Sequence, residues 1–188
     1  MWWSDMRLVA VLTRLLPAMA LAALLGGCFQ PLYSEHAISG DNESVAQALR
    51  HVDVAELKTA RGSRIDRVGF QIRNSLIYSL TGGNGGSSPA YRLNINLNSS
   101  QQQIVVDPST GRADVSNYGI DANYTLTDLA TGKVVVRSVA SARVSYNIPG
   151  QQQRFAGERG LRDAEDRAAK VIADGIRNRL ASYFTAGT

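Results

Sequence analysis

The chain has 188 residues, of which 44% are hydrophobic and 19% are charged. This length is sufficient to bury the core of one domain of ordinary size. Twenty Lys and Arg residues against 16 Asp and Glu residues give a formal net charge of +4. The mild positive charge permits contact with an anionic lipid or glycan. The sequence contains no block of consecutive basic residues, so we expect no nucleic-acid partner.

The N-terminal segment has the composition of an export signal. Arg7 and Arg14 accompany an uncharged apolar run from Leu15 to Leu25, which is too short to cross a membrane. Two glycines and Cys28 follow the run directly. The string Leu-Gly-Gly-Cys resembles the bacterial lipoprotein box, in which the cysteine is lipidated and becomes the first residue of the mature protein.

Cys28 is the only cysteine of the chain. A single unpaired thiol is unusual in an exported protein, and lipidation would account for it. The alternative is an ordinary signal peptide followed by a chance free thiol. We predict that residues 1–27 are a removed signal peptide and that residues 28–44 form a lipidated N-terminus and tether. The covalent lipid on Cys28 leaves no thiol for a disulfide, so the fold must depend on packing.

Residues 45–188 are predicted to form a single α/β domain that begins with a strand and a helix. Residues 52–57 alternate, with Val52 and Val54 on one side and Asp53 on the other, as in a short strand. A helix is predicted over residues 64–80, with Ser63 as its N-cap and a glycine-rich loop after it. Its apolar residues recur every three or four positions: Ile65, Val68, Ile72, Leu76 and Leu80.

Three further strands are predicted from strict alternation. One face would carry Tyr91, Leu93, Ile95 and Leu97 in the first, Tyr118, Ile120, Ala122, Tyr124 and Leu126 in the second, and Val134, Val136, Ala140, Val144 and Tyr146 in the third. Residues 107–111 and 130–132 have turn compositions, so we expect an antiparallel meander with one buried face.

A long helix is predicted from about Glu158 to Phe184. Its apolar stripe comprises Leu161, Ala164, Ala168, Val171, Ile172, Gly175, Ile176, Leu180 and Tyr183. Acidic residues precede basic ones by four positions in Glu158/Arg162, Asp163/Arg167 and Asp166/Lys170, which predicts a charged, solvated outer face. The fold class is therefore α+β: a two-layer sandwich in the order β-α-β-β-β-α, whose mostly antiparallel four-stranded sheet is covered on one face by two helices.

The order of these elements and several local strings resemble the lipopolysaccharide-assembly lipoprotein family LptE, in its alphaproteobacterial form. The strings span residues 28–33, 67–76, 91–93, 124–132, 145–147, 162–165 and 176–184. The resemblance implies an outer-membrane lipoprotein that plugs the LptD β-barrel, helps to assemble it and assists lipopolysaccharide delivery to the cell surface. In the family a glycine often follows the lipidated cysteine, whereas Phe29 stands there in this chain.

No pattern of residues predicts catalysis or metal binding. His36 and His51 are isolated and lack the spacing of paired metal ligands, and no Gly-x-Ser-x-Gly string is present. We therefore expect no enzyme, no metal and no cofactor other than the lipid on Cys28. Arg73 and Asn74, in the middle of the first predicted helix, are a solvated face or, less favoured, a binding feature.

Three basic residues near predicted turns are the expected contacts of lipopolysaccharide phosphates. Arg112 and Lys133 follow turn sequences, and Arg154 lies between the last strand and the last helix. Arginine and lysine at such positions can present several donors to a phosphate without being buried. Arg154 has the strongest case, because the family resemblance places a basic lipopolysaccharide contact within one residue of it.

Two other function classes fit parts of the sequence. An auxiliary lipoprotein of another envelope lipid-transport system of the ABC type could share the anchor, the mild basicity and the α/β domain. An envelope hydrolase is motivated only by the Asn, Ser and Thr residues on the polar strand face, which resemble a glycan-binding surface. Purification of partners would distinguish the first alternative, and turnover of cell-wall or lipid substrates would distinguish the second.

Overall fold

The computed structural model describes residues 44–83, 88–104, 115–148 and 154–186. All of these described residues belong to one compact unit. The elements in chain order are α2 (Val45–Arg50), β1 (Val52–Val54), α3 (Arg64–Thr81), β2 (Tyr91–Ile104), β3 (Val115–Asp128), β4 (Val134–Asn147) and α4 (Arg154–Ala186). Within the described ranges no helix is both long and apolar enough to cross a membrane.

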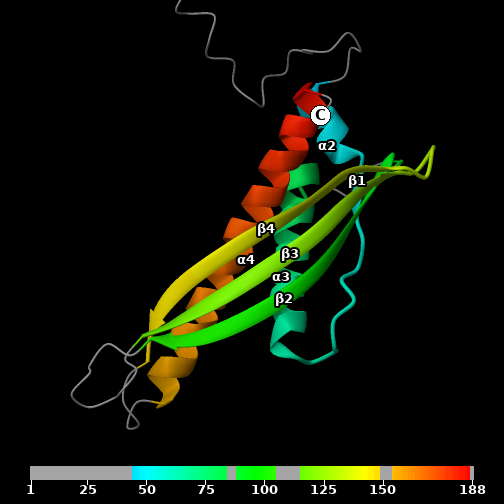
Figure 1. Cartoon of the computed structure of the whole chain (residues 1–188). Coiled ribbons are helices and arrows are strands. Elements are labelled where there is room, and N and C mark those ends of the chain that lie inside the picture. The colour runs from blue at the N-terminus through cyan, green and yellow to red at the C-terminus, as the bar shows by residue number, and fades with distance from the viewer. Residues whose placement is uncertain (1–43, 84–87, 105–114, 149–153, 187–188) are drawn as a thin grey trace, which may run out of the picture. The chain divides into compact units, whose positions relative to one another are not determined.

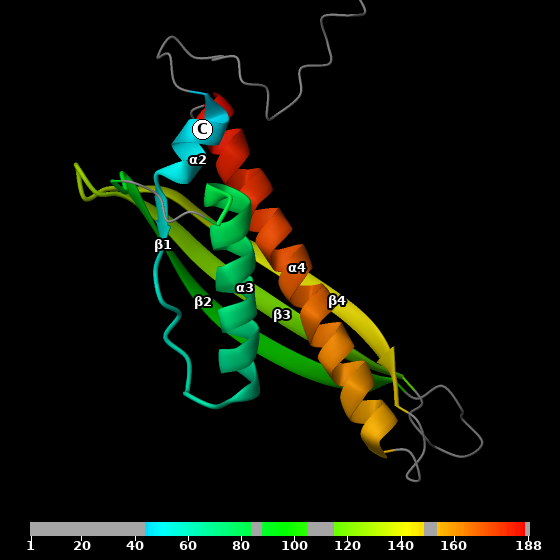
Figure 2. The same ribbon diagram turned by 180° about the vertical axis from the view of Figure 1, so that it is seen from behind.

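The four strands form one sheet in the order β1-β2-β3-β4. β1 pairs in parallel with β2, and the other pairings are antiparallel, as expected for a meander. Figure 1 shows β2, β3 and β4 in front of α3 and α4, and Figure 2 shows both helices from the other side. The predicted α+β sandwich, with two helices on a single face of the sheet, is confirmed.

The residues at the two ends of α3 explain where the helix begins and ends. The Ser63 hydroxyl accepts a hydrogen bond from the backbone N–H of Asp66 at 3.2 Å, as an N-cap does. Gly82 ends the helix with a φ of 72°, a left-handed conformation that glycine adopts without strain. The predicted N-cap is confirmed, and the helix is one residue longer than expected.

The sequence prediction contained no helix before β1, yet α2 is present. Ser44 and Gln47 form a capping box: the Ser44 side chain accepts from the Gln47 N–H at 3.3 Å, and the Ser44 N–H donates to the Gln47 side chain at 3.1 Å. Val45 and Leu49 are buried against the other helices. Burial of one short apolar face therefore stabilises a helix too short to persist alone.

The predicted buried face of β2 and β3 is confirmed, but β4 contains a correction. The pairing passes from Leu126↔Val136 to Thr127↔Val134, so Val135 is an extra residue at a β-bulge. The bulge places Val134 opposite Thr127, on the solvent face, where Val134 is exposed. Strict alternation could not predict that reversal.

The buried stripe of α4 also differs from its prediction. Val171 and Gly175 are exposed, whereas Ala169, Ala173 and Ala181 are buried with the expected Ile172, Ile176 and Leu180. Of the predicted ion pairs, Asp163 and Arg167 lie 2.8 Å apart, while Glu158 lies 3.5 Å from Arg64 of α3. The buried stripe is therefore rotated toward alanines, and α4 packs against α3 as well as against β3 and β4.

Candidate functional site

The face of the sheet that α3 and α4 leave open is a long polar surface. We call it the uncovered face, and it consists of the residues of β2, β3 and β4 that point away from the two helices. Most of them are polar: Arg92, Asn94, Asn96, Asn98, Asn117, Asp121, Asn123, Thr125, Arg137, Ser141, Arg143 and Ser145. Three paired strands of 14 residues carry this surface, so it is about 45 Å long.

Arg143 is held in place on the uncovered face. Its Nη2 donates to both carboxylate oxygens of Asp121, at 3.0 and 2.8 Å, and its Nη1 donates to the Ile120 carbonyl at 3.1 Å. Gly119 makes this path possible, because an added Cβ would lie 3.0 Å from the Arg143 side chain and 2.7 Å from the Ser100 hydroxyl. The guanidinium therefore lies across the backbone of β3.

Hydrogen bonds between neighbouring strands continue along this face. The Ser141 hydroxyl donates to Asp121 at 2.7 Å, and the Ser145 hydroxyl donates to the Asn117 side-chain oxygen at 2.6 Å. Bonds from Arg143 and then from Ser141 hold the pKa of Asp121 below its usual value. The result is an ordered, polar surface that can hydrogen-bond with another polar surface.

The structure describes two of the three basic residues that were expected to meet lipopolysaccharide, and it separates them. Lys133 is exposed in the β3–β4 turn, where the Asp128 carboxylate accepts from the N–H groups of Ala130 and Thr131. Arg154 begins α4 at the other end of the meander, beside the end of β4 (Figure 2). Lys133 and Arg154 therefore do not share one site. Arg112 and Cys28 lie outside the described residues.

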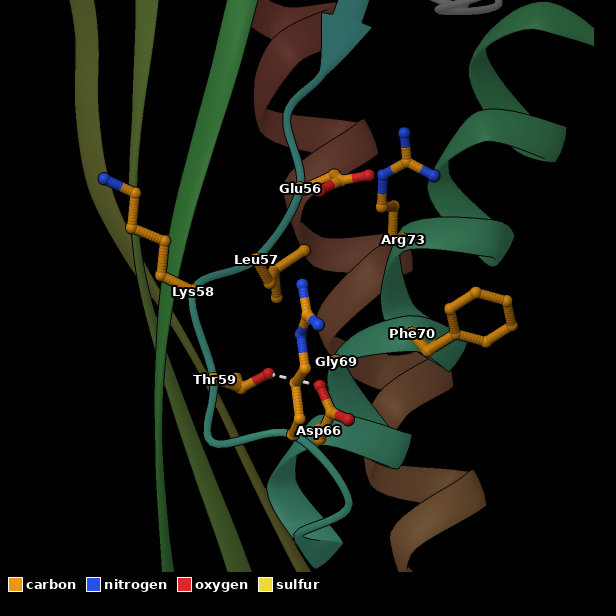
Figure 3. Close-up of a pocket in the computed structure, with 9 residues that line it drawn as sticks. Glu56, Leu57, Lys58, Thr59, Asp66, Gly69, Phe70 and Arg73 are labelled. Atoms are coloured by element: carbon orange, nitrogen blue, oxygen red, sulfur yellow. Dashed lines mark hydrogen bonds between the residues drawn. The ribbon is translucent and has the colours of Figure 1, made fainter.

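A groove of about 850 Å³ lies between the segment 56–61 and α3 (Figure 3). The Asp66 carboxylate orders its wall by accepting from the Thr59 hydroxyl at 2.6 Å and from the Gly62 N–H at 3.0 Å, and these bonds lower the pKa of Asp66. Gly69 forms part of the lining, since a Cβ there would lie 3.2 Å from Leu57. Phe70 stands at the groove with 65% of its surface exposed.

Arg73 also lines this groove, but its guanidinium has a structural role. Its Nε donates to the Val54 carbonyl at 3.2 Å, at the outer edge of β1. The neighbouring Asn74 is exposed. Of the two interpretations of Arg73 and Asn74, solvated face or binding feature, neither anticipated this contact with the backbone of the sheet.

Sequence reasoning missed a buried ion pair between the two long helices. Arg67 of α3 donates to the carboxylate of Glu165 of α4, which is 1% exposed. The other carboxylate oxygen, Oε1, has no hydrogen-bond partner among the described residues. Burial raises the pKa of Glu165, and Arg67 only partly opposes this effect. Arg67 and Glu165 belong to two of the strings that carried the family resemblance, and the fold brings them into contact.

Of the two histidines, the structure describes His51 only. His51 ends α2, and its Nδ1 lies 3.0 Å from the Ser88 carbonyl. His36 lies outside the described residues. Among residues 44–83, 88–104, 115–148 and 154–186, no three potential metal ligands gather.

Comparison with known proteins gives both a family and a fold. Residues 49–180 match the sequence profile of a family described as "LptE: Lipopolysaccharide-assembly". No significant match was found among curated proteins. Among solved structures, a protein of Caulobacter crescentus CB15, solved as a candidate lipoprotein, is similar with a TM-score of 0.57 and 23% identity over 76% of this chain and 96% of its own.

Two other structures are similar at lower scores. Rare lipoprotein B of Shewanella oneidensis gives a TM-score of 0.49 with 13% identity, over 70% of this chain and 92% of its own. A minor lipoprotein of Acinetobacter baumannii gives a TM-score of 0.40 with 12% identity, over 68% of this chain and 91% of its own. The Caulobacter structure alone of these three supports the fold assignment.

Proposed function

Because this chain belongs to the LptE family of lipopolysaccharide-assembly lipoproteins, we propose that it is an outer-membrane lipoprotein that plugs the LptD β-barrel. In that position it would help the barrel to assemble and assist lipopolysaccharide delivery to the cell surface. The family is a non-enzymatic one, and the uncovered face offers hydrogen-bonding groups.

The uncovered face is the observation that carries the plug proposal. The interior of a large membrane β-barrel is polar, so a plug must present polar groups to the barrel wall. The face presents arginine, asparagine, serine and threonine side chains along three strands, and several of them are fixed by contacts such as Arg143–Asp121. Fixed donors and acceptors reduce the entropy lost on binding.

Attachment through Cys28 is the second part of the proposal. A single acyl chain anchors a protein only marginally, whereas two or more anchor it stably. A diacylglyceryl group with an N-acyl chain on Cys28, after removal of residues 1–27, would hold the domain at the membrane. Cys28→Ser should leave the protein in the soluble fraction or uncleaved, and an unchanged acylated mass would contradict the assignment.

Lipopolysaccharide contact is proposed for Arg154, with Arg112 and Lys133 as weaker contacts. Arg154→Glu should weaken lipopolysaccharide binding, and the loss should be largest at low salt, where exposed charges are least screened. Lys133→Glu should weaken binding less than Arg154→Glu does, and Lys170→Glu, on the exposed side of α4, is the matched control. Equal binding by wild type and Arg154→Glu across a salt series would contradict the assignment.

Purification of the full-length lipoprotein from native membranes tests the plug itself. We expect LptD to be recovered in equal amounts with the wild type, and to be lost when Asn96→Arg and Thr125→Arg place two bulky charges on the uncovered face. Lys170→Glu, on the exposed side of α4, should leave the complex intact. Recovery of an ABC-transporter complex without LptD would overturn the proposal in favour of another lipid-transport system.

A further inference from the structure

We propose that the free edge of β4, between Arg137 and Arg143, pairs with an extended segment of a partner protein, which adds a fifth strand to the sheet. We call this stretch the open edge. Within the described residues β4 pairs with β3 alone. The proposal goes beyond the barrel plug, because it concerns the edge of the sheet and not its uncovered face.

Arg143 shows which backbone groups point outward at the open edge. Its Nη1 donates both to the Ile120 carbonyl at 3.1 Å and to the Ala142 carbonyl at 3.0 Å. One atom can reach both only if the two carbonyls lie between the strands, so Ile120 and Ala142 are a hydrogen-bonded pair. Since antiparallel pairs alternate, the N–H and C=O groups of residues 137, 139, 141, 143 and 145 point to the free side.

The two edges of the sheet are protected to different extents. At β1, which has three residues, Arg73 of α3 donates to the Val54 carbonyl. At β4, which has 14 residues, Arg167 of α4 donates to the Ser145 carbonyl at 3.3 Å. The bulge at Val135 disturbs the other end of β4.

The open edge between these two features lacks two of the usual forms of protection. It contains no proline, and its helix-side residues, Ser138, Ala140 and Ala142, carry no charge. The guanidinium of Arg143 is turned away, toward Asp121. A strand edge of this length without those features is a template for strand addition.

α4 provides an apolar contact beside the open edge. A Cβ at Gly175 would lie 3.9 Å from Ala140, and Arg167 reaches Ser145, so α4 runs antiparallel to β4. Val171 lies one helical turn from Gly175 and one from Arg167, on the same side of α4. Its side chain is 51% exposed. An added strand would cover Val171 with an inward side chain, and Gly175 has no side chain to obstruct it. The apolar stripe predicted for α4 would then be complete.

Charge indicates a partner other than a second copy. Arg143 and Arg167 are already paired with Asp121 and Asp163, so Arg137 is the cation of this edge that no described carboxylate pairs. A second copy paired about Ala140 would place Arg143 opposite Arg137 and would offer no carboxylate. We therefore assign the fifth strand to a different chain, with an apolar residue facing Val171 and an acidic residue opposite Arg137.

Photo-crosslinking of the full-length lipoprotein in native membranes tests this assignment. A benzophenone amino acid replaces Val171 or, as the control, the exposed Tyr78 of α3. We expect the probe at 171 to crosslink a peptide of another protein that contains acidic and apolar residues, at least tenfold more than the probe at 78. Mapping of the crosslinked peptide by mass spectrometry identifies the strand.

A proline at the edge separates strand addition from general damage. Val139 is 57% exposed and its N–H points outward, so Val139→Pro removes a donor from the open edge without removing a bond to β3. Val139→Thr keeps the N–H and is the matched control. The proline variant should lose at least tenfold in crosslinking from position 171, while the threonine variant should crosslink as the wild type does.

Hydrogen exchange keeps the proposal falsifiable if Val139→Pro fails to fold. In native membranes the Val139 and Ser141 amides of the wild type should exchange at least tenfold more slowly than in the purified protein. Crosslinks to residues 28–43 of the same chain or to a second copy would overturn the assignment. Equal crosslinking by a folded Val139→Pro variant, or equal exchange rates in the two preparations, would also overturn it.

Discussion

The two faces of the sheet are ordered by different forces. The covered face packs against α3 and α4 through fully buried aliphatic side chains such as Leu93, Ile120 and Leu126. The uncovered face is held by bonds between exposed side chains, of which Arg143–Asp121 is the best defined. Burial of a large aliphatic side chain stabilises by about 1.5 to 3 kcal/mol, whereas an exposed ion pair contributes about 0 to 1 kcal/mol. Stability therefore resides on one face, which leaves the other free for recognition.

A charge buried on the covered face should reduce the stability of the domain the most. Ile72 of α3 and Ile176 of α4 are completely buried, so Ile72→Asp or Ile176→Asp would place an unpaired carboxylate in the core. We expect a loss of about 4 kcal/mol or more, enough to unfold a marginal domain. The matched change on the uncovered face, Asn96→Asp, should change stability by about 0.5 kcal/mol or less. Denaturant unfolding measures both, and wild-type midpoints for either isoleucine variant would refute the core assignment.

Removing one partner of the buried ion pair should have the next largest effect. Arg67→Ala leaves the Glu165 carboxylate buried without its cation, and we expect a loss of about 2 kcal/mol, since Arg67 itself is 48% exposed and water can partly replace it. Glu165→Gln should cost less, because the buried charge is removed. A double-mutant cycle with urea unfolding checks the coupling, and additive effects would show that the pair contributes nothing.

The same pair predicts a pH dependence. Burial raises the pKa of Glu165 above its usual 4.5, so the folded state holds this proton more tightly than the unfolded state does. The resulting stability is fully present below pH 4.5 and is lost as pH rises through the elevated pKa. Glu165→Gln should flatten this part of the stability curve, measured as melting temperature against pH. An unchanged slope would assign the dependence to other groups.

Two glycine-to-alanine substitutions should change stability by smaller amounts, one lowering it and the other raising it. Gly119→Ala places a Cβ 2.7 Å from the Ser100 hydroxyl and 3.0 Å from Arg143, so the arginine must move, at a cost of about 1 kcal/mol. Gly175→Ala meets only Ala140 at 3.9 Å and should stabilise α4 by up to about 1 kcal/mol. The melting temperatures of the two variants show whether each substitution stabilises or destabilises the domain. Stabilisation by Gly119→Ala would show that Arg143 does not lie across β3.

The smallest expected effect concerns acid stability of the uncovered face. Bonds from Arg143 and Ser141 lower the pKa of Asp121 below 3.8, so its contribution is present above pH 3.8 and is lost as pH falls through the lowered value. Asp121→Asn should reduce the acid sensitivity slightly, measured as the change in melting temperature between pH 5 and pH 3. The exposed Asp163→Asn is the control. A larger response in the control would contradict the role of Asp121.

Patterns with a fixed period predicted most of the fold. Alternation in β2 and β3 identified Leu93, Ile95, Ile120 and Leu126 as buried, because one buried face imposes a period of two on a strand. The three- and four-residue spacing of apolar residues predicted α3 correctly, because one buried face imposes that spacing on a helix. α2 was missed because six residues are too few to show a period, although Ser44 and Gln47 had the spacing of a capping box.

Features that depend on distant partners were not predictable. Glu165 lies 98 residues from Arg67 in the sequence, and only its place within the apolar stripe of α4 signalled that it is buried. The bulge at Val135 has no local signature, so Val134 was assigned to the wrong face. The lipid site at Cys28 and the ligand contacts at Arg112, Lys133 and Arg154 stay predictions from the sequence.

The position of α2 has a consequence for how far the domain can reach from a bilayer. α2 packs beside the C-terminal end of α4, and Ala90 joins its C-cap residue His51 to the β3–β4 turn through two backbone hydrogen bonds (Figure 1). Ser44 lies 16 residues after Cys28, a span of at most about 58 Å, and the 33 residues of α4 extend about 50 Å further. If a lipid on Cys28 anchors the domain as we propose, the end of the domain that carries Lys133 stays nearer to the lipid headgroups, while the start of α4 at Arg154 can reach almost twice as far.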